Sequence, residues 1–421
     1  MESLAIIGTG IAGMSAGYFL KNQCRVTFFE KNDYPGGHTN TVTIDEEGRL
    51  VPIDTGFMVY NEITYPHLTR LFKELDVKTM PTSMSFSVSH QPSGLEYCGT
   101  GIRGLFSRRK NIFNPRFIHL LTQMNRFNHQ SVEVLTDPQY SGYTTQEYAE
   151  EKGFGEDFLQ KYLLPMSSAV WSTPLDLMLK FPIVTLVRFF KNHGFLGLRT
   201  HHQWRTVVGG SKEYRDKILG LFKDNVFLKC PITKIVREKA KVQLYDSSGT
   251  KRVYDKVILA SHADQSLSLL SDATLIERRV LKKFRYQKNR ATLHTDFSVM
   301  PQTKRAWSSW NYRLSLDLKG RIRPSTVYYM NSLQKVSKKK DYFISINDPM
   351  DVHPAKILWE TEYEHPIFDL DAISAQQELP VLNEDGRVFF CGSYFKYGFH
   401  EDALESGLNV ARLISKNRIW P

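Results

Sequence analysis

The sequence predicts an α/β fold that begins with a parallel sheet, and three observations near the N-terminus predict it. Leu4–Ile7 is a short apolar run of the kind that forms a buried parallel strand. Glycines in a GxGxxG spacing, residues 8–13, follow it directly. Arg25–Phe29 reads as a second strand and ends at Glu30, twenty residues after Gly10. A strand, a glycine turn, a helix and an acid at this spacing indicate a Rossmann-type dinucleotide-binding unit.

The three glycines have separate physical roles in such a turn. Gly8 permits the tight turn, Gly10 lets the backbone approach a pyrophosphate, and Gly13 lets helix and strand pack closely. The helix is expected from Ile11 to about Asn22, and its N-terminus offers free N–H groups to the phosphates.

Glu30 is placed to accept hydrogen bonds from the ribose hydroxyls of the dinucleotide. An acid at this position argues against NADP, but it does not distinguish NAD from FAD. A glycine-rich turn in an unrelated α/β protein is the alternative interpretation of the same residues.

The residues after Glu30 separate the two cofactors. EKNDYPGGHTNTV carries Gly36 and Gly37, and IDTGFMVYN carries Gly56 and Phe57. Here the chain resembles the flavin-containing amine oxidase superfamily, which includes monoamine oxidases, phytoene-type desaturases and protoporphyrinogen oxidase. The resemblance implies FAD, with the backbone of the glycine pair running along its diphosphate.

His38 stands where this family usually has an arginine. Backbone N–H groups still reach the diphosphate after that change, but the two-pronged contact of a guanidinium is lost. Some members hold the flavin covalently through a cysteine in the C-terminal turn. Residues 392–400 contain no cysteine, and Cys391 belongs to the preceding strand. The resemblance therefore implies non-covalent FAD.

The resemblance continues in family order to the C-terminus. VVGGSKEYRDKILGLF is similar to a family segment that leads into a helix, and YDKVILASHADQSLSLL to a strand and turn that return to the flavin. NVFLKCPITKIVRE is similar to the strand beside the adenine, with Ile232 in the matching place. GSYFKYGFHEDALESG is similar to the last flavin turn, where a backbone N–H near His400 faces the pyrimidine O2.

The implied architecture is amine-oxidase-like, with two interleaved domains. A Rossmann-type FAD-binding domain takes residues 1–75, 205–270 and 380–421, and an α+β substrate domain takes residues 76–204 and 271–379. The motif and the resemblance together assign these cofactor-binding residues: Gly8, Gly10, Ile11, Ala12, Gly13, Glu30, Lys31, Gly36, Gly37, His38, Thr39, Gly56, Phe57, Met58, Ile232, Gly392, Ser393, Gly398, Phe399, His400 and Ala403.

A closer resemblance concerns the substrate. DTGFMVYNEITYPHLTRLFKELDV, SMSFSVS and GFHEDALESG are similar to a bacterial subgroup of predicted flavin-containing amine oxidases. They are also similar to the N-terminal flavin region of plant cyclopropane-fatty-acid synthases. This resemblance implies a fatty-acyl or other lipid substrate.

Two stretches carry many basic residues and no acids. Tyr97–Val132 and Leu177–Lys212 contain arginines and lysines interleaved with Phe, Leu and Ile, in a chain of net charge +11. Such segments suit either a solvated face of a helical domain or peripheral contact with an anionic membrane. Without a nucleic-acid-binding motif, we expect no nucleic acid partner.

His294 and His400 are the candidate catalytic residues. ATLHTDF alternates like a strand, which places Thr292, His294 and Asp296 on one face. By resemblance, His294 lies near the position of a family lysine that holds a water beside the flavin. A structural histidine bonded to Asp296 or to backbone is the alternative. Glu401 and the acid after it are interpreted as stabilisers of a helix N-terminus.

Other site types find no support in the sequence. The four cysteines have neither zinc-ligand nor CxxC spacing, and neither the His201-His202 pair nor residues 400–402 show metal-site spacing, so we expect no metal. A GxSxG motif is absent. The first ten residues lack signal-peptide features and no apolar run of transmembrane length occurs, so a cytoplasmic protein is expected.

The sequence thus predicts an FAD-dependent oxidoreductase that takes a hydride from a C–H bond of an organic substrate. A fatty-acyl chain is the first substrate expectation, and an amine is the second. A redox-neutral flavin isomerase and a non-catalytic flavin- or lipid-binding accessory protein are the remaining alternatives.

Overall fold

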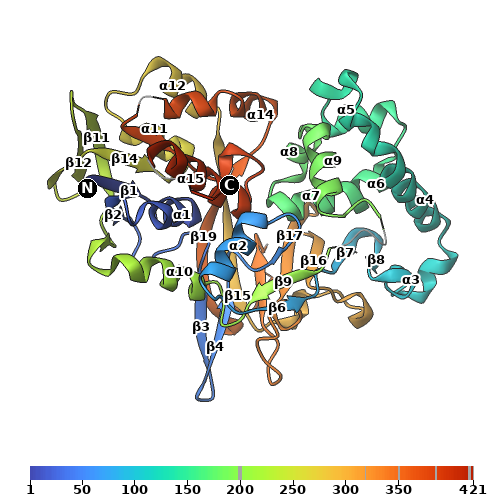
Figure 1. Ribbon diagram of the computed structural model, residues 1–421. Coiled ribbons are helices and arrows are strands. Elements are labelled where there is room, and N and C mark those ends of the chain that lie inside the picture. Colours follow the sequence, from blue (N-terminus) through green and yellow to red (C-terminus); the bar gives the residue numbers. More distant parts are fainter. Residues whose placement is uncertain (198–201, 318, 349–350, 385, 416–418, 421) are drawn as a thin grey trace.

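A computed structural model describes residues 1–197, 202–317, 319–348, 351–384, 386–415 and 419–420 (Figure 1). Its dinucleotide-binding layer is a parallel sheet with the strand order β10-β2-β1-β14-β20. The strands are β1 (Glu2–Ile7), β2 (Cys24–Phe29), β10 (Val226–Phe227), β14 (Lys256–Leu259) and β20 (Val388–Phe390). The predicted α/β class is confirmed, because three segments distant in sequence form one parallel sheet.

Helices pack around this sheet. They are α1 (Ile11–Leu20), α10 (Lys212–Leu219), α11 (Ala263–Leu269), α12 (Leu275–Leu281), α14 (Leu370–Gln376) and α15 (His400–Ile414). Helices α1 and α15 lie against each other at Gly407, where a Cβ atom would meet the Ala12 carbonyl oxygen at 2.2 Å. The Ser15 hydroxyl also donates to the Leu404 carbonyl at 3.1 Å. The contact joins the glycine turn to the C-terminal turn.

A second, mixed sheet forms the other main layer, with the order β19-β15-β18-β17-β16-β7-β8. Its neighbours pair antiparallel except β7 and β16, which are parallel. The strands are β7 (Phe86–His90), β8 (Leu95–Cys98), β15 (Arg285–His294), β16 (Trp310–Leu316), β17 (Ile322–Tyr329), β18 (Phe343–Ile346) and β19 (Ile357–Ile367). Of the long strand β15, the sequence predicted only the C-terminal half.

Smaller elements connect the two layers. They are the hairpin β3 (Thr41–Glu46) and β4 (Arg49–Asp54), the small sheet of β5 (Tyr60–Asn61), β9 (Trp204–Val207) and β6 (Thr79–Thr82), the three-stranded sheet of β11 (Ile232–Arg237), β12 (Val242–Asp246) and β13 (Lys251–Tyr254), and helices α2 (Pro66–Glu74) and α13 (Met330–Leu333).

A helical region lies at the end of the molecule opposite the N-terminus (Figure 1). It comprises α3 (Gly101–Leu105), α4 (Pro115–Gln130), α5 (Thr145–Glu151), α6 (Glu156–Phe158), α7 (Leu164–Trp171), α8 (Leu175–Leu179) and α9 (Ile183–Asn192). It has its own aromatic core, which includes Phe117, Phe127 and Phe158. None of the described helices is both long and apolar enough to span a bilayer.

The parallel sheet draws its strands only from the segments predicted for the FAD-binding domain. The helical region and most of the mixed sheet fall in the segments predicted for the substrate domain. Strand β6 continues the small sheet past residue 75, so this sheet crosses one predicted boundary. The exact boundaries stay a prediction.

A candidate cofactor and substrate cavity

A cavity of about 860 Å³ is lined by residues from both main sheets and from the helical region. Its size lies in the range of cofactor and ligand sites, which are generally concave and mostly apolar. The β1–α1 turn, the end of β2, the turn after β14 and the residues before α15 contribute from the first sheet. The carboxyl ends of parallel strands therefore meet at this cavity, as expected for a dinucleotide site.

The glycine turn shows which glycines are packed and which one faces open space. Gly8 has φ +105°, and a Cβ atom there would lie 2.7 Å from the Ala260 carbonyl oxygen. A Cβ on Gly13 would lie 2.2 Å from the Gly8 carbonyl oxygen. A Cβ on Gly10 would meet no atom within 4 Å, and a Cβ on Gly37 would lie 3.5 Å from the Gly10 Cα. Packing thus explains the outer glycines, whereas Gly10 leaves room in the cavity.

Glu30 is held at the end of β2 by its neighbours. One carboxylate oxygen accepts hydrogen bonds from the Thr9 hydroxyl at 2.6 Å and from the Thr9 N–H at 3.1 Å. The other accepts from the Asn32 N–H at 3.1 Å. Since a carboxylate has about four acceptor positions, Glu30 keeps capacity for a further donor in the cavity.

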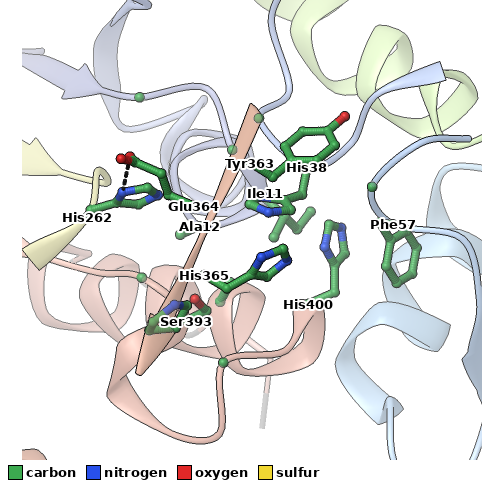
Figure 2. Close-up of a pocket in the computed structure, with 18 of the residues that line it drawn as sticks. Ile11, Ala12, His38, Phe57, His262, Tyr363, Glu364, His365, Ser393 and His400 are labelled. Carbon is green, nitrogen blue, oxygen red and sulfur yellow. Dashed lines mark ion pairs between the residues drawn. The ribbon is translucent and has the colours of Figure 1, made fainter. Parts of the chain in front are cut away.

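Three histidines gather at the centre of the cavity wall (Figure 2). The His400 ring stacks on Phe57 with 3.8 Å between ring centroids, and its Nε2 lies 2.7 Å from the Tyr214 hydroxyl. The His365 ring lies 5.0 Å from the ring of His38, measured between centroids. The three side chains come from α15, β19 and the loop after β2, so the fold alone brings them together.

Desolvation keeps these imidazoles neutral. It lowers the pKa of His400 to about 3 and that of His38 well below its usual range. The pKa of His365 falls to about 4, mainly through burial and secondarily through the nearby His262. The Asn289 amide donates to Nδ1 of His365 at 2.8 Å, so neutral His365 carries its proton on Nε2. This wall is therefore polar but uncharged near neutral pH.

All charged side chains among the described lining residues lie toward the dinucleotide end of the cavity. Glu30 and Lys31 follow β2, Lys288 lies on β15, and Glu362 and Glu364 lie on β19. Figure 2 shows the ion pair between Glu364 and His262, which lies in the turn after β14, at a distance of 3.2 Å.

The opposite end of the cavity, here called the apolar end, has a different lining. It is formed by α7, α9, β9, β16 and the loops before β7 and α15. Its side chains include Met84, Trp171, Phe189, Trp204, Trp310 and Phe399. None of the described lining residues from these elements is Asp, Glu, Lys or Arg.

Nineteen of the twenty-one residues predicted to bind the cofactor line the cavity. They are Gly8, Gly10, Ile11, Ala12, Glu30, Lys31, Gly36, Gly37, His38, Gly56, Phe57, Met58, Ile232, Gly392, Ser393, Gly398, Phe399, His400 and Ala403. Gly13 and Thr39 are not among the lining residues. Gly13 supports the turn from behind, and the fully buried Thr39 hydroxyl lies 2.8 Å from that of Tyr214.

His294 is not among the lining residues, in contrast to the prediction that it acts beside the flavin. Strand β15 ends at His294, and the ring is fully buried. Its Nε2 lies 2.8 Å from the Ser345 hydroxyl, and its Nδ1 accepts from the Asp296 N–H at 3.1 Å. Both ring nitrogens are therefore engaged within the protein, as the structural alternative expected. This placement argues against a catalytic role.

The acids after His400 hold the chain in place. Glu401 accepts hydrogen bonds from the backbone N–H groups of His67 and Leu68 at the start of α2. Asp402 accepts from the N–H groups of Phe399 and Tyr397, and burial raises the pKa of its carboxyl to about 7. These contacts fit the predicted role of stabilising helix N-termini. Asp402 acts at the start of its own helix, α15, and Glu401 acts at the start of α2.

Metal ligation finds no support within the described ranges, where no three His, Cys, Asp or Glu side chains gather as a ligand set. His201, one of the residues considered for metal binding, lies outside the described residues. The ring of His202 bonds instead to the Asn192 carbonyl at 2.8 Å.

The sequence did not single out His365, which lines the central wall, or Asn289, which contacts it from outside the lining. For Trp310 the sequence left open a wall of the site or core packing, and the residue lines the apolar end. The only local signal was the position of His365 before a proline, which indicates a turn more than a site.

Comparison with known proteins identifies the family. Residues 11–295 match the family described as flavin containing amine oxidoreductase, which is more than half of the chain. The chain belongs to this family. None of the curated proteins matches the sequence.

Solved structures of similar fold cover nearly the whole chain. A putrescine oxidase variant has a TM-score of 0.69 at 13% identity, over 98% of each chain. A cyclohexylamine oxidase from Brevibacterium oxydans has a TM-score of 0.67 at 18% identity, over 98% of each chain. A fatty acid isomerase from P. acnes that produces CLA has a TM-score of 0.67 at 14% identity, over 98% of this chain and 99% of its own. At these identities the similarity establishes the fold alone.

The protein is thus an FAD-dependent oxidoreductase of the flavin containing amine oxidoreductase family. The residues present fit the cofactor. Gly10 leaves open space where the protein backbone must approach the pyrophosphate, and Glu30 can still accept a hydrogen bond from a ribose hydroxyl. His38 Nε2 and the Tyr394 hydroxyl, both on lining residues, are buried without a hydrogen-bond partner. When bound, FAD supplies the hydride-accepting chemistry, and the chain binds and orients.

Proposed function

We propose that this FAD-dependent oxidoreductase acts on a fatty-acyl chain, taking a hydride from one of its C–H bonds. The observation that carries the proposal is the uncharged apolar end of the cavity. Its described lining consists of aromatic and aliphatic side chains, including Trp171, Phe189 and Trp204. Burial of a hydrocarbon chain there is favourable by about 0.8 kcal/mol per CH₂ group. An ammonium would be desolvated without a carboxylate partner.

Trp310 supplies a polar contact of matching chemistry. It lines the apolar end, and its Nε1 is buried without a hydrogen-bond partner. An indole N–H only donates, so it suits a carbonyl oxygen and cannot accept from an ammonium. A carbonyl or ester oxygen at one end of an acyl chain would satisfy this donor.

Two comparisons support an acyl substrate by analogy. The resemblance to the bacterial subgroup and to the flavin region of plant cyclopropane-fatty-acid synthases points to lipid chains. A protein described as a fatty acid isomerase shares the fold over the whole chain. Fold similarity alone does not carry a function to this chain, so the cavity lining remains the main argument.

The proposal includes non-covalent attachment of FAD. Cys391 is fully buried, burial raises the pKa of its thiol, and it is not among the lining residues. A neutral, inaccessible thiol is a poor nucleophile toward a flavin. Acid precipitation of the yellow protein should release all FAD into the supernatant, and flavin in the pellet would contradict this part.

Anaerobic flavin bleaching with matched substrate panels tests the proposed function. Fatty-acyl esters of different lengths should bleach the visible absorbance of the oxidised flavin. Primary amines of equal chain length should not. Bleaching by amines alone would favour the amine oxidase alternative. A product formed without net reduced flavin would instead favour the isomerase.

Trp310→Phe sharpens the same experiment. Loss of one hydrogen bond should raise KM for the acyl ester by about tenfold, with FAD still bound. The matched control is Trp359→Phe, because Trp359 lies on β19 and is not among the lining residues. Equal KM in the Trp310 variant and wild type would remove Trp310 from substrate recognition.

A further inference from the structure

The segment 101–118, here called the basic tip, combines exposed apolar and basic side chains at one end of the helical region. It contains α3, a short 3₁₀ helix at residues 109–113 and the first turn of α4. In Figure 1 it lies far from the parallel sheet. Phe113 is 86% exposed and Ile102 is 75% exposed. Such clustering of large apolar side chains in solvent marks an interaction surface more often than a scattered single residue does.

The exposed apolar side chains are held in place by an ordered backbone. Asn111, two residues before Phe113, is buried and donates from its amide to the Glu96 carbonyl at 3.1 Å. Asn114, directly after Phe113, caps α4 by accepting from the N–H groups of Arg116 and Phe117. Phe113 is therefore fixed between an anchor and a helix cap, with its ring directed into solvent.

Packing beneath the basic tip ties its two helical parts together. The Phe106 ring, after α3, meets the Phe117 ring of α4 edge to face at 5.8 Å. Gly104 lets α3 approach β8, since a Cβ there would lie 2.6 Å from the Cys98 sulfur. Residues 101–118 consequently form one packed unit, and the exposed side chains belong to its outer surface.

The charges of the basic tip are positive and mostly unpaired. Exposed Arg103, Arg109, Lys110 and Arg116 form no ion pair with any described residue. Arg108 lies 4.0 Å from Glu96, the nearest acid in sequence. The Glu96 carboxylate is buried and also accepts from the N–H groups of residues 302 and 303, so it presents no negative charge at the surface.

We propose that the basic tip docks the protein on an anionic phospholipid bilayer. Phe113 and Ile102 enter the interface between head groups and acyl chains, and the unpaired cations contact lipid phosphates. Each Lys or Arg near an anionic surface strengthens binding about fivefold, and a buried phenylalanine adds roughly tenfold or more. A nucleic acid would use the cations but leaves the exposed isoleucine without a role, which is why a bilayer fits better.

The proposal does not depend on the substrate. A bilayer surface is a place where acyl chains are available, yet the docking surface and the apolar end consist of different residues. Vesicle binding and flavin reduction are measured separately, so failure of one leaves the other intact.

Flotation of the FAD-loaded protein with phospholipid vesicles tests the docking surface. Wild type should float with vesicles of phosphatidylcholine and phosphatidylglycerol, not with phosphatidylcholine alone, and salt should weaken the binding. The variant Arg109→Gln/Lys110→Gln/Arg116→Gln should bind roughly a hundred-fold more weakly. The variant Ile102→Ser/Phe113→Ser should lose about tenfold or more.

Controls separate docking from folding and from other partners. Leu275→Ser removes an equally exposed apolar side chain, 88% exposed at the start of α12, and should float as wild type does. All variants should keep their yellow colour. In Phe113→Trp, the added emission should shift to the blue with anionic vesicles. The proposal would be overturned if wild type and both multiple variants floated equally, or if Phe113→Trp showed no blue shift. It would also be overturned if the multiple variants lost binding to a duplex oligonucleotide while their vesicle binding stayed unchanged.

Discussion

The two ends of the cavity are built in opposite ways. At the dinucleotide end, contacts depend on backbone shape, with Gly8 and Gly13 packed against carbonyl oxygens and Gly10 facing open space. At the apolar end, contacts depend on side chains such as Trp171 and Phe189, brought together from different elements. The dinucleotide end therefore suits a cofactor that is common to a family. At the apolar end, side-chain substitutions can alter which substrate binds while the backbone stays the same.

Gly13→Ala should have the largest effect on this comparison. The new Cβ would lie 2.2 Å from the Gly8 carbonyl oxygen, so β1 and α1 must separate. We expect a loss of about 3 kcal/mol in the free energy of unfolding, together with loss of bound FAD. Urea unfolding and the visible spectrum measure both. The control Gly220→Ala adds a Cβ with no neighbour within 4 Å and should change neither.

Gly10→Ala should separate cofactor binding from folding. Nothing lies within 4 Å of the new Cβ, and the backbone conformation of Gly10 is available to alanine. The stability of the apoprotein should stay within about 0.5 kcal/mol of wild type. FAD affinity should fall by about tenfold or more, because the backbone no longer approaches the pyrophosphate. Unchanged affinity in a titration of apoprotein with FAD would argue against the proposed position of the diphosphate.

Met84→Glu tests the other end. Met84 is half-buried and lines the apolar end, so the variant places a carboxylate where wild type has none among the described lining residues. KM for an acyl ester should rise roughly tenfold, while FAD affinity stays the same. The variant Met84→Gln has the same shape without the charge and should show a smaller rise. Identical kinetics of the Glu and Gln variants would show that charge does not select the substrate.

Asp402→Asn should disturb the comparison between the two ends least, because its effect is on pH-dependent stability. Burial raises the pKa of Asp402 to about 7 in the folded protein, above its unfolded value near 4. The folded state therefore binds the extra proton, and this contribution to stability is lost as pH rises from about 4 through 7. Asparagine keeps an acceptor for the Phe399 and Tyr397 N–H groups.

The measurement for Asp402 is the difference between two proteins, because the buried histidines titrate in the opposite sense. From pH 5 to 8, wild type should lose about 2–3 kcal/mol relative to Asp402→Asn. Thermal unfolding at several pH values gives this difference. If the stabilities of wild type and Asp402→Asn changed in parallel with pH, Asp402 would not carry the raised pKa.

The predictable part of the site consists of short segments in which neighbours in sequence make the contacts. Gly8–Gly13, the pair Gly36 and Gly37, and the turn before α15 line the cavity or support its wall as expected. Local steric rules decide where a glycine is needed and how a helix N-terminus presents its N–H groups. Such rules act over a few residues, and they can be recognised in a sequence.

His294 shows where that reasoning ends. Alternation along β15 indicates which side chains share a face, but not which part of the strand meets the cavity. Lys288 lines the cavity, whereas His294 lies six residues further, about 20 Å along an extended strand. Alternation therefore placed His294 on a face of the strand but could not place it beside the cavity.

The sequence by itself determined the α/β class, the glycine turn and Glu30, because each depends on local backbone geometry, whereas FAD was implied by the family resemblance. Only the tertiary structure decided that His38, His365 and His400 share one wall and that Trp310 lines the apolar end. His38 lies more than two hundred residues from the other three in sequence, and the pairing of β15 with β19 and the packing of α15 on α1 bring them together. Such contacts depend on register and packing across the whole fold, which no short stretch of sequence records.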